Sequence, residues 1–231
     1  MKIKEKNLCT ICARGGSKGV KDKNIKKING VSLLERSINQ AKKAKIFDKI
    51  VLSTDSKKII NLSKSLGVDY TFLRSTKLSN DKVSKIDVIK DSLNKSEKNF
   101  GYRFDNIIDI DLTTPLRQIK DIKNAFYNFK NNNYYNLISV CEAKKNPYFN
   151  IIEIKNNNTK LVKNIKHYTT RQSSPKVFDV NSAIYIWKRD FLIKSNKIVY
   201  PKTGIYIMPR ERSIDIDDNF DLYLVKKLIG E

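Results

Sequence analysis

The stretch of sequence that decides the fold is Leu8-Cys9-Thr10-Ile11-Cys12-Ala13-Arg14-Gly15-Gly16-Ser17-Lys18-Gly19. Its first half, residues 8–13, is mainly apolar and predicts a strand. Its second half is a loop rich in glycine and positive charge. In open α/β sheets, ligands bind at the carboxyl ends of the strands. We therefore look for chemistry where this strand and its neighbours end.

The alternation of strand and helix continues along the chain. We expect strands at 50–53, 70–73, 107–112 and 137–141, and helices at 31–44, 57–66, 83–93 and 119–129. Such repeated units predict a mostly parallel, Rossmann-like α/β sheet with helices on both faces. Later segments read as strands with little helix between them, at 148–154, 161–168, 178–187 and 204–208, before a closing helix at 217–229. The sequence thus predicts a single domain over 1–231 with a β-rich arm inserted at about 146–180.

The chain carries a large positive charge, but the residues that supply it do not indicate a nucleic-acid-binding protein. The formal net charge is +22, but it comes from 37 lysines and only 9 arginines among 231 residues. Arginine is the usual residue for reading bases and gripping phosphates, and the lysines are scattered over every expected helix. We therefore expect solvated helix faces and no nucleic-acid partner, although the field would attract a polyphosphate or an acidic sugar.

Membrane insertion and secretion are not expected either. The longest unbroken apolar run has five residues, 183–187, whereas a membrane-spanning helix needs about 20. No secretory signal is visible at the start, and three cysteines form no disulfide framework. We expect a cytoplasmic protein. Cys9 and Cys12 should face opposite sides of their strand, and His167 is the only histidine, so a metal or redox role for these residues is not expected.

The glycine-rich loop after the first strand predicts phosphate binding. Arg14, Lys18, Lys21 and Lys23 bring positive charge to it, and its glycines let backbone amides approach a phosphate closely. The loop matches neither the Walker A motif nor the dinucleotide-binding motif. A flexible basic surface loop is the alternative. Its position after the first strand favours a nucleoside triphosphate.

Two acidic pairs predict further site chemistry. In the stretch 213–217, Asp215 and Asp217 would share one side of an extended segment and offer hard oxygen ligands to Mg²⁺. The alternatives are a polar outer face and an acidic first turn of the last helix. Asp109 and Asp111 alternate in the same way before Thr113-Thr114-Pro115-Leu116-Arg117. Taken alone, this second pair is an ordinary turn from strand to helix.

Taken together, these motifs resemble those of the N-acylneuraminate cytidylyltransferases. The resemblance begins at Ile11–Gly19 with Lys23-Asn24 and covers nearly the whole chain in order. The other matching stretches are Ser53-Thr54-Asp55, Leu73-Arg74, Leu78–Asp81, Thr113–Arg117, Arg171-Gln172 with Pro175, Asn181–Tyr185 and Ser213–Asp217. Each stretch alone is modest, but the set is specific.

The resemblance implies a fold, a reaction and partners. The fold would be of the nucleotide-diphospho-sugar transferase type, with the arm serving dimerisation. CTP and a nine-carbon 2-keto sugar acid, a nonulosonic acid, would give the CMP-sugar and pyrophosphate. Mg²⁺ would be the cofactor, with Mn²⁺ as a substitute. Members are usually homodimers in which the inserted arm reaches the neighbouring subunit's site.

The resemblance also implies roles for individual residues. Arg14, Lys23 and Asp217 would be catalytic, the proton acceptor staying open between Asp217 and a metal-bound hydroxide, and Asp215 and Asp217 would bind the metal. The residues expected to bind the nucleotide are Ala13, Arg14, Gly15, Gly16, Ser17, Lys18, Lys23, Asn24, Arg74, Asp81 and Ser84. The residues expected to bind the sugar acid are Asp111, Thr113, Arg117, Arg171, Gln172 and Asn181.

Three departures from the family pattern bear on the acceptor. Asp111 stands where well-known sialic acid members have a glutamine, Lys85 where many members have a serine, and Asp179 where a basic residue is expected. The stretch 175–181 looks more like the branch that acts on legionaminic acid. We favour that acceptor over N-acetylneuraminic acid. Pseudaminic acid, KDO and, from another class, a basic nucleic-acid-binding protein are the alternatives.

Overall fold

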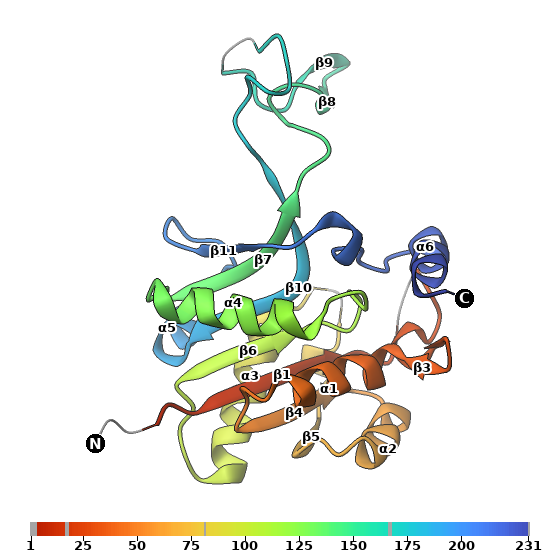
Figure 1. Ribbon diagram of the computed structural model, residues 1–231, viewed down its shortest axis with the longest axis vertical. Helices are drawn as coiled ribbons and strands as arrows, with labels where there is room; N and C mark the ends of the chain where they lie inside the picture. Colours follow the sequence, from red (N-terminus) through yellow and green to blue (C-terminus); the bar gives the residue numbers. More distant parts are fainter. Residues whose placement is uncertain (1–3, 17–18, 81, 166–167, 231) are drawn as a thin grey trace.

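A seven-stranded sheet forms the centre of the molecule in the computed structural model, which describes residues 4–16, 19–80, 82–165 and 168–230 (Figure 1). Across the sheet the strands are β11 (Gly204–Ile207), β7 (Asn136–Glu142), β10 (Phe178–Lys188), β6 (Asn106–Ile110), β1 (Asn7–Ala13), β4 (Lys49–Thr54) and β5 (Tyr70–Leu73). Only β10 among them runs antiparallel to its neighbours. The expected mostly parallel α/β sheet is confirmed.

Helices cover both faces of this sheet, as the strand–helix alternation predicts. Buried apolar side chains of α1 (Leu33–Ala44), α2 (Lys57–Ser65), α4 (Ile119–Asn131) and α6 (Asn219–Ile229) form a core with one face. Those of α3 (Lys85–Phe100) and α5 (Arg189–Lys194) form a core with the other. Cys9 and Cys12 belong to opposite cores, because successive side chains of a strand point to opposite faces.

The carboxyl ends of the central strands meet at one edge of the sheet. β1 lies between β4 and β6 and runs parallel to both, with Ala13 paired to Thr54. The short pair β2 (Lys27–Ile28) and β3 (Val31–Ser32) then leads into α1. The helix α3 begins near the same edge, where the Ser84 hydroxyl accepts a hydrogen bond from the Asp87 amide. Such N-caps fix the position at which a helix starts.

An arm, described over residues 143–165 and 168–177, leaves the sheet between β7 and β10. Figure 1 shows its two strands, β8 (Ile152–Lys155) and β9 (Asn158–Leu161), far from the main sheet. The expected strands at 148–154 and 161–168 are therefore wrong in their bounds. Asn156 and Asn157 both have positive φ values, 51° and 60°, which suit the tight turn of a two-residue hairpin. Because the turn lies at these two residues, the four residues of β8 pair with the four that follow the turn, and β9 ends at Leu161.

Two other observations complete the fold. The helix α5 was not predicted from the sequence, because a helix of only six residues shows little helical periodicity. No helix in the described parts of the chain combines the length and the apolar character that crossing a membrane requires. His167 lies outside the described residues.

Candidate active site

One cavity brings the basic loop and the acidic segment together at the carboxyl edge of the sheet. It has a volume of about 440 Å³ and is lined by Cys12, Arg14, Gly16, Gly19, Lys23, Asn24, Asp111, Thr113 and Asp217. These residues come from the loop after β1, the loop after β6 and the segment before α6. Positive and negative side chains thus face a single concave space, which is suited to a triphosphate together with its counter-ion.

The glycine-rich loop is held in place by its own hydrogen bonds. The Asn24 side-chain amide donates to the Arg14 carbonyl at 2.7 Å, and the Gly15 amide donates to the Asp55 carboxylate at 2.7 Å. Asp55 was not among the expected site residues, although it follows β4 at the same edge. Ser17 and Lys18 lie outside the described residues. The loop is thereby fixed on two sides of the cavity.

The same loop also contacts the acidic segment directly. The Lys23 ammonium donates a hydrogen bond to the Ile216 carbonyl and lies 3.9 Å from the Asp217 carboxylate. Gly19 approaches so closely that an added Cβ would lie 1.8 Å from the Asp217 carbonyl oxygen. A side chain at residue 19 would therefore push the two parts of the site apart, so this position requires glycine.

The segment 213–218 forms no strand, and its two expected metal ligands differ in exposure, Asp215 being half-buried and Asp217 exposed. Ile214 and Ile216 pack against the core, while the Asp217 side chain is 83% exposed. The Ile216 amide donates to the Thr113 carbonyl at 2.8 Å, which ties this segment to the loop after β6. Asp218 instead caps α6 by accepting from the Phe220 and Asp221 amides. The helix-cap alternative thus applies to Asp218.

Asp215 has the properties of a cation ligand. Its Oδ1 atom is buried and has no hydrogen-bond partner within the described part of the chain. Burial and the carboxylates of Asp111 and Asp217 raise its pKa, Thr113 and Lys23 oppose the rise, and the result is a pKa of about 6. A buried carboxylate oxygen without a partner, beside other carboxylates, gains from a divalent cation. The residues present therefore fit a metal ion held by Asp215 and Asp217.

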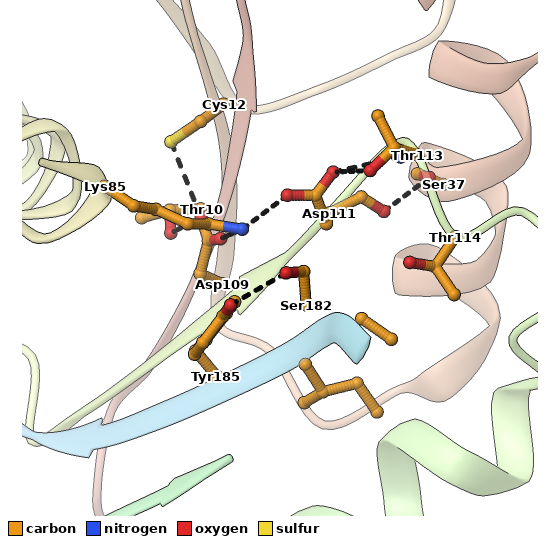
Figure 2. A network of polar contacts seen from close by, with 12 residues as sticks. Thr10, Cys12, Ser37, Lys85, Asp109, Asp111, Thr113, Thr114, Ser182 and Tyr185 are labelled. Carbon is orange, nitrogen blue, oxygen red and sulfur yellow. Dashed lines mark hydrogen bonds and ion pairs between the residues drawn. The ribbon is translucent and has the colours of Figure 1, made fainter. Parts of the chain in front are cut away.

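A network of ion pairs and hydrogen bonds lies beside Asp215 and joins Lys85, Asp109, Asp111 and Thr10 (Figure 2). The Lys85 ammonium lies 3.0 Å from the Asp109 carboxylate and 2.5 Å from that of Asp111. Asp109 is fully buried and accepts a 2.7 Å hydrogen bond from the Thr10 hydroxyl. Burial alone would raise the pKa of Asp111, but Lys85 and hydrogen bonds from Thr113 lower it to about 2. The sequence singled out Asp109, Asp111 and Lys85 but gave no sign that they meet.

Two residues expected to bind the sugar lie in the interior instead of the cavity. Arg117 is 1% exposed, and its guanidinium donates to the carbonyls of Asp111 and Ala183 and to the side chains of Ser37 and Gln40. Burial lowers its pKa to about 10. Asn181 is 4% exposed and bonds Ser139 and Ser213. Both side chains hold loops of the site in position, because they form hydrogen bonds with other residues of the chain.

The remaining expected residues lie at three other places. Arg74 is 7% exposed, and its Nε and Nη2 atoms lack hydrogen-bond partners among the residues described. Ser84 caps α3, and Asp81 is outside the described residues. Arg171 and Gln172 line a separate cavity of about 470 Å³ at the base of the arm, where Arg171 donates to the Ala143 carbonyl at 2.7 Å. They do not line the cavity that Arg14 and Asp217 share.

Comparisons with known proteins agree with this geometry. The family model described as "Cytidylyltransferase" matches residues 8–225, so the chain belongs to the cytidylyltransferase family. "Post-translational flagellin modification protein B" of Campylobacter coli is 46% identical over 225 residues, covering 97% of this chain and 95% of that protein. "CMP-N,N'-diacetyllegionaminic acid synthase" of Campylobacter jejuni subsp. jejuni serotype O:2 is 45% identical over 224 residues, covering 96% and 94%. The resemblance stated from the sequence is thereby confirmed.

A solved structure shows the same fold. The structure of CMP:2-keto-3-deoxy-manno-octonic acid synthetase complexed with CTP superposes with a TM-score of 0.70 and covers 98% of this chain and 99% of its own. At 14% identity this likeness concerns the fold alone. The family and the relatives named as CMP-sugar synthases make the chain a CTP-dependent nucleotidyltransferase.

Proposed function

We propose that this protein transfers CMP from CTP to a nonulosonic acid and releases pyrophosphate, with a legionaminic acid as the acceptor. The observation that carries the proposal is the single cavity shared by the basic glycine-rich loop and Asp217, in a chain of the cytidylyltransferase family. The choice of acceptor is supported by the relative named CMP-N,N'-diacetyllegionaminic acid synthase, which matches 96% of the chain.

The basic loop would neutralise the triphosphate. The anomeric hydroxyl of the sugar attacks the α-phosphorus of CTP in line with the departing pyrophosphate. Such transfers depend on positioning and on stabilising the charge that develops on the phosphates. Arg14 and Lys23 would bind the charge on the departing pyrophosphate, helped by the backbone amide of Gly16. The Arg14 guanidinium donates to the Gly16 carbonyl and the Lys23 ammonium to the Ile216 carbonyl, and these hydrogen bonds hold both side chains at the cavity before the substrate arrives.

The acidic segment would hold the cofactor, which we propose to be Mg²⁺ with Mn²⁺ as a substitute. Asp215 and Asp217 are its ligands, which is supported by the buried, unpartnered Oδ1 atom of Asp215. When bound, such an ion neutralises phosphate charge and makes the attacking hydroxyl more acidic. Asp217, which is exposed and next to Lys23, is our candidate for accepting the hydroxyl proton.

We also propose that the active protein is a homodimer whose arm completes the partner's site. Arg171 and Gln172 are expected to contact the sugar acid, yet they lie at the base of the arm, apart from the cavity of their own subunit. The arm also exposes Ile152, Ile154 and Ile165, which are 60%, 73% and 77% accessible. Exposed apolar side chains gathered on one projection favour contact with another subunit.

A mixing experiment tests the shared site. Subunits carrying Arg171→Ala lack one element of the composite site, and subunits carrying Asp215→Asn lack the other. If the site is shared, hybrid dimers contain one site with both defects and one intact site, so mixing two inactive variants restores activity. If each subunit uses its own Arg171, the mixture stays inactive. A monomer in sedimentation analysis would also contradict the proposal.

The acceptor is tested by the product. The protein is incubated with CTP, Mg²⁺ and a mixture of nonulosonic acids and KDO, and the CMP-sugars are identified by mass spectrometry. We expect the CMP-legionaminic acid derivative to dominate. A dominant pseudaminic, neuraminic or KDO product would replace the acceptor but keep the reaction. Absence of any CMP-sugar, with or without divalent cations, would refute the proposed function.

A further inference from the structure

Lys85 holds together two carboxylates that would otherwise repel each other. It is the first residue of α3, and its ammonium contacts Asp109 at 3.0 Å and Asp111 at 2.5 Å. The same Nζ atom lies 4.4 Å from the centroid of the Tyr185 ring. Its side chain is only 23% exposed. Its ammonium therefore faces two carboxylates and an aromatic ring of the protein, which points to a role in positioning its partners.

Asp111 is the member of this network that reaches the cavity. Its Oδ1 atom accepts hydrogen bonds from the amide and the hydroxyl of Thr113, at 2.9 and 2.8 Å. Its Oδ2 atom accepts from Lys85. Each carboxylate oxygen can accept two hydrogen bonds, so among the described residues one acceptor position on Oδ2 is left over. Because Asp111 lines the cavity, this position is available to a bound substrate.

A group fixed in this way is selective. A charged carboxylate only accepts hydrogen bonds, and its lost hydration is replaced only by a substrate that offers an N–H or O–H there. A substrate that presents an acceptor or a methylene at that point leaves the carboxylate unsatisfied, and sites of this kind reject such analogues strongly. Tying three of the four acceptor positions of Asp111 to Thr113 and Lys85 prevents the side chain from turning to escape the mismatch.

We propose that Lys85 and Asp111 form a specificity-determining pair for the acceptor sugar acid. Lys85 is the positioning residue, and Asp111 selects acids that present an acylamino N–H or a hydroxyl to its free Oδ2 position. The inference rests on the proposed function and adds a substrate feature to it. Asp109, held by Thr10 and Lys85, anchors the pair to the sheet.

The test compares sugar acids with and without a donor. Wild-type protein is assayed with legionaminic acid and with analogues in which one acylamino or hydroxyl group at a time is replaced by hydrogen. We expect one replacement to lower kcat/KM by at least ~100-fold, with the KM for CTP changed less than ~3-fold. If no single replacement has this effect, the inference is wrong although the reaction itself stands. If no acid reacts, the proposed function fails first.

Variants then assign the effect to the pair. In Asp111→Asn the amide oxygen should stay toward the Thr113 donors, so the amide nitrogen takes the place of Oδ2 and turns an acceptor into a donor. We define the preference as the ratio of kcat/KM for the acid with the donor group to kcat/KM for the analogue without it. We expect this preference to fall at least ~10-fold, while Lys85 remains paired with Asp109. Lys85→Met should reduce the same preference, and Lys85→Arg, which keeps the charge, should retain more of it. An unchanged preference in Asp111→Asn would overturn the inference.

Two further measurements separate specificity from folding. Lys95→Met makes the same substitution on the same helix, in a surface ion pair with Asp91, and should leave the preference unchanged. The double variant Lys85→Met/Asp111→Asn removes both charges and should lose no more preference than Asp111→Asn alone. Independent, multiplying losses would show that the two residues do not act as a pair. This double variant serves where Lys85→Met alone does not fold.

Discussion

Gly19→Ala tests whether the phosphate loop and the acidic segment act as one unit. The added Cβ would lie 1.8 Å from the Asp217 carbonyl oxygen and 3.0 Å from its carbonyl carbon. Non-bonded heavy atoms rest at roughly 3.5 Å, so one of the two segments has to move by more than about 1 Å. Lys23, bonded to the Ile216 carbonyl, resists this separation. The substitution therefore strains the contact that closes the cavity.

The expected effects follow from that displacement. Forcing an extra carbon into a packed contact costs about 1–3 kcal/mol. For a chain of this size each kcal/mol corresponds to about 2–4 °C, so we expect the melting temperature to fall by about 2–12 °C. A shift of about 1 Å in a catalytic group can lower turnover by about 100-fold. Thermal unfolding and pyrophosphate release from CTP measure the two effects.

Gly16→Ala is the matched control for stability. An added Cβ at residue 16 meets nothing within 4 Å, and its φ is not in the left-handed region. We expect its melting temperature to equal or slightly exceed that of the wild type, because alanine restricts the unfolded chain. If Gly19→Ala melts and turns over like the wild type, the close contact with Asp217 does not exist. If only its melting temperature falls, the contact is structural and does not align the catalytic groups.

Three other perturbations are expected to have these results. Asp215→Asn should lower turnover by at least ~100-fold, yet without divalent cations it should melt no lower than the wild type, because it removes a charge that burial disfavours. Arg117→Met should lower the free energy of unfolding by at least about 2 kcal/mol, since it removes four hydrogen bonds of the interior that contribute about 0.5–1.5 kcal/mol each. For Asp111, a folded pKa of about 2 lies below the ordinary 3.8, so its stabilisation, about 2 kcal/mol, is complete above pH 4 and is lost as the pH falls toward 2.

Each of these expectations has a contradicting outcome. A folded Asp215→Asn variant with near-normal turnover would remove this residue from the metal site. An Arg117→Met variant as stable as the wild type in urea would show that water replaces the lost donors. Lys85→Met should lose the acid-sensitive stabilisation, so identical unfolding profiles between pH 4 and pH 2 for variant and wild type would contradict the assigned ion pair.

Much of the fold could be predicted because local periodicity carries it. The strand expected at 70–73 coincides with β5, and the helix expected at 57–66 differs from α2 by one residue. Strand order is a different matter. β10 is inserted between β6 and β7, and no local pattern reveals that a later strand enters the sheet antiparallel. In the arm, few core contacts constrain the pattern, and the bounds of β8 and β9 follow from the turn at Asn156 and Asn157.

The site divides in the same way. The basic loop could be placed at this edge because it follows β1 directly. The acidic segment lies there although it follows no strand, since β11 ends at Ile207. The burial of Arg117 and Asn181 could not be anticipated, because their partners belong to segments far apart in the sequence that only the folded chain brings together. Likewise, Lys85 and Asp111 are 26 positions apart on a helix and a loop. Their contact arises from the packing of α3 on the sheet, which leaves no trace in residue spacing.

The anchoring of Arg117 has a consequence for the thermodynamics of substrate binding. Its guanidinium already holds the turn after β6 through four internal hydrogen bonds without any ligand. Fixing a flexible residue costs about 1–2 kcal/mol of conformational entropy. Residues 111–117 lose that entropy when the chain folds. The turn is therefore already ordered when a substrate binds, and no further entropy cost of ordering it weakens the affinity.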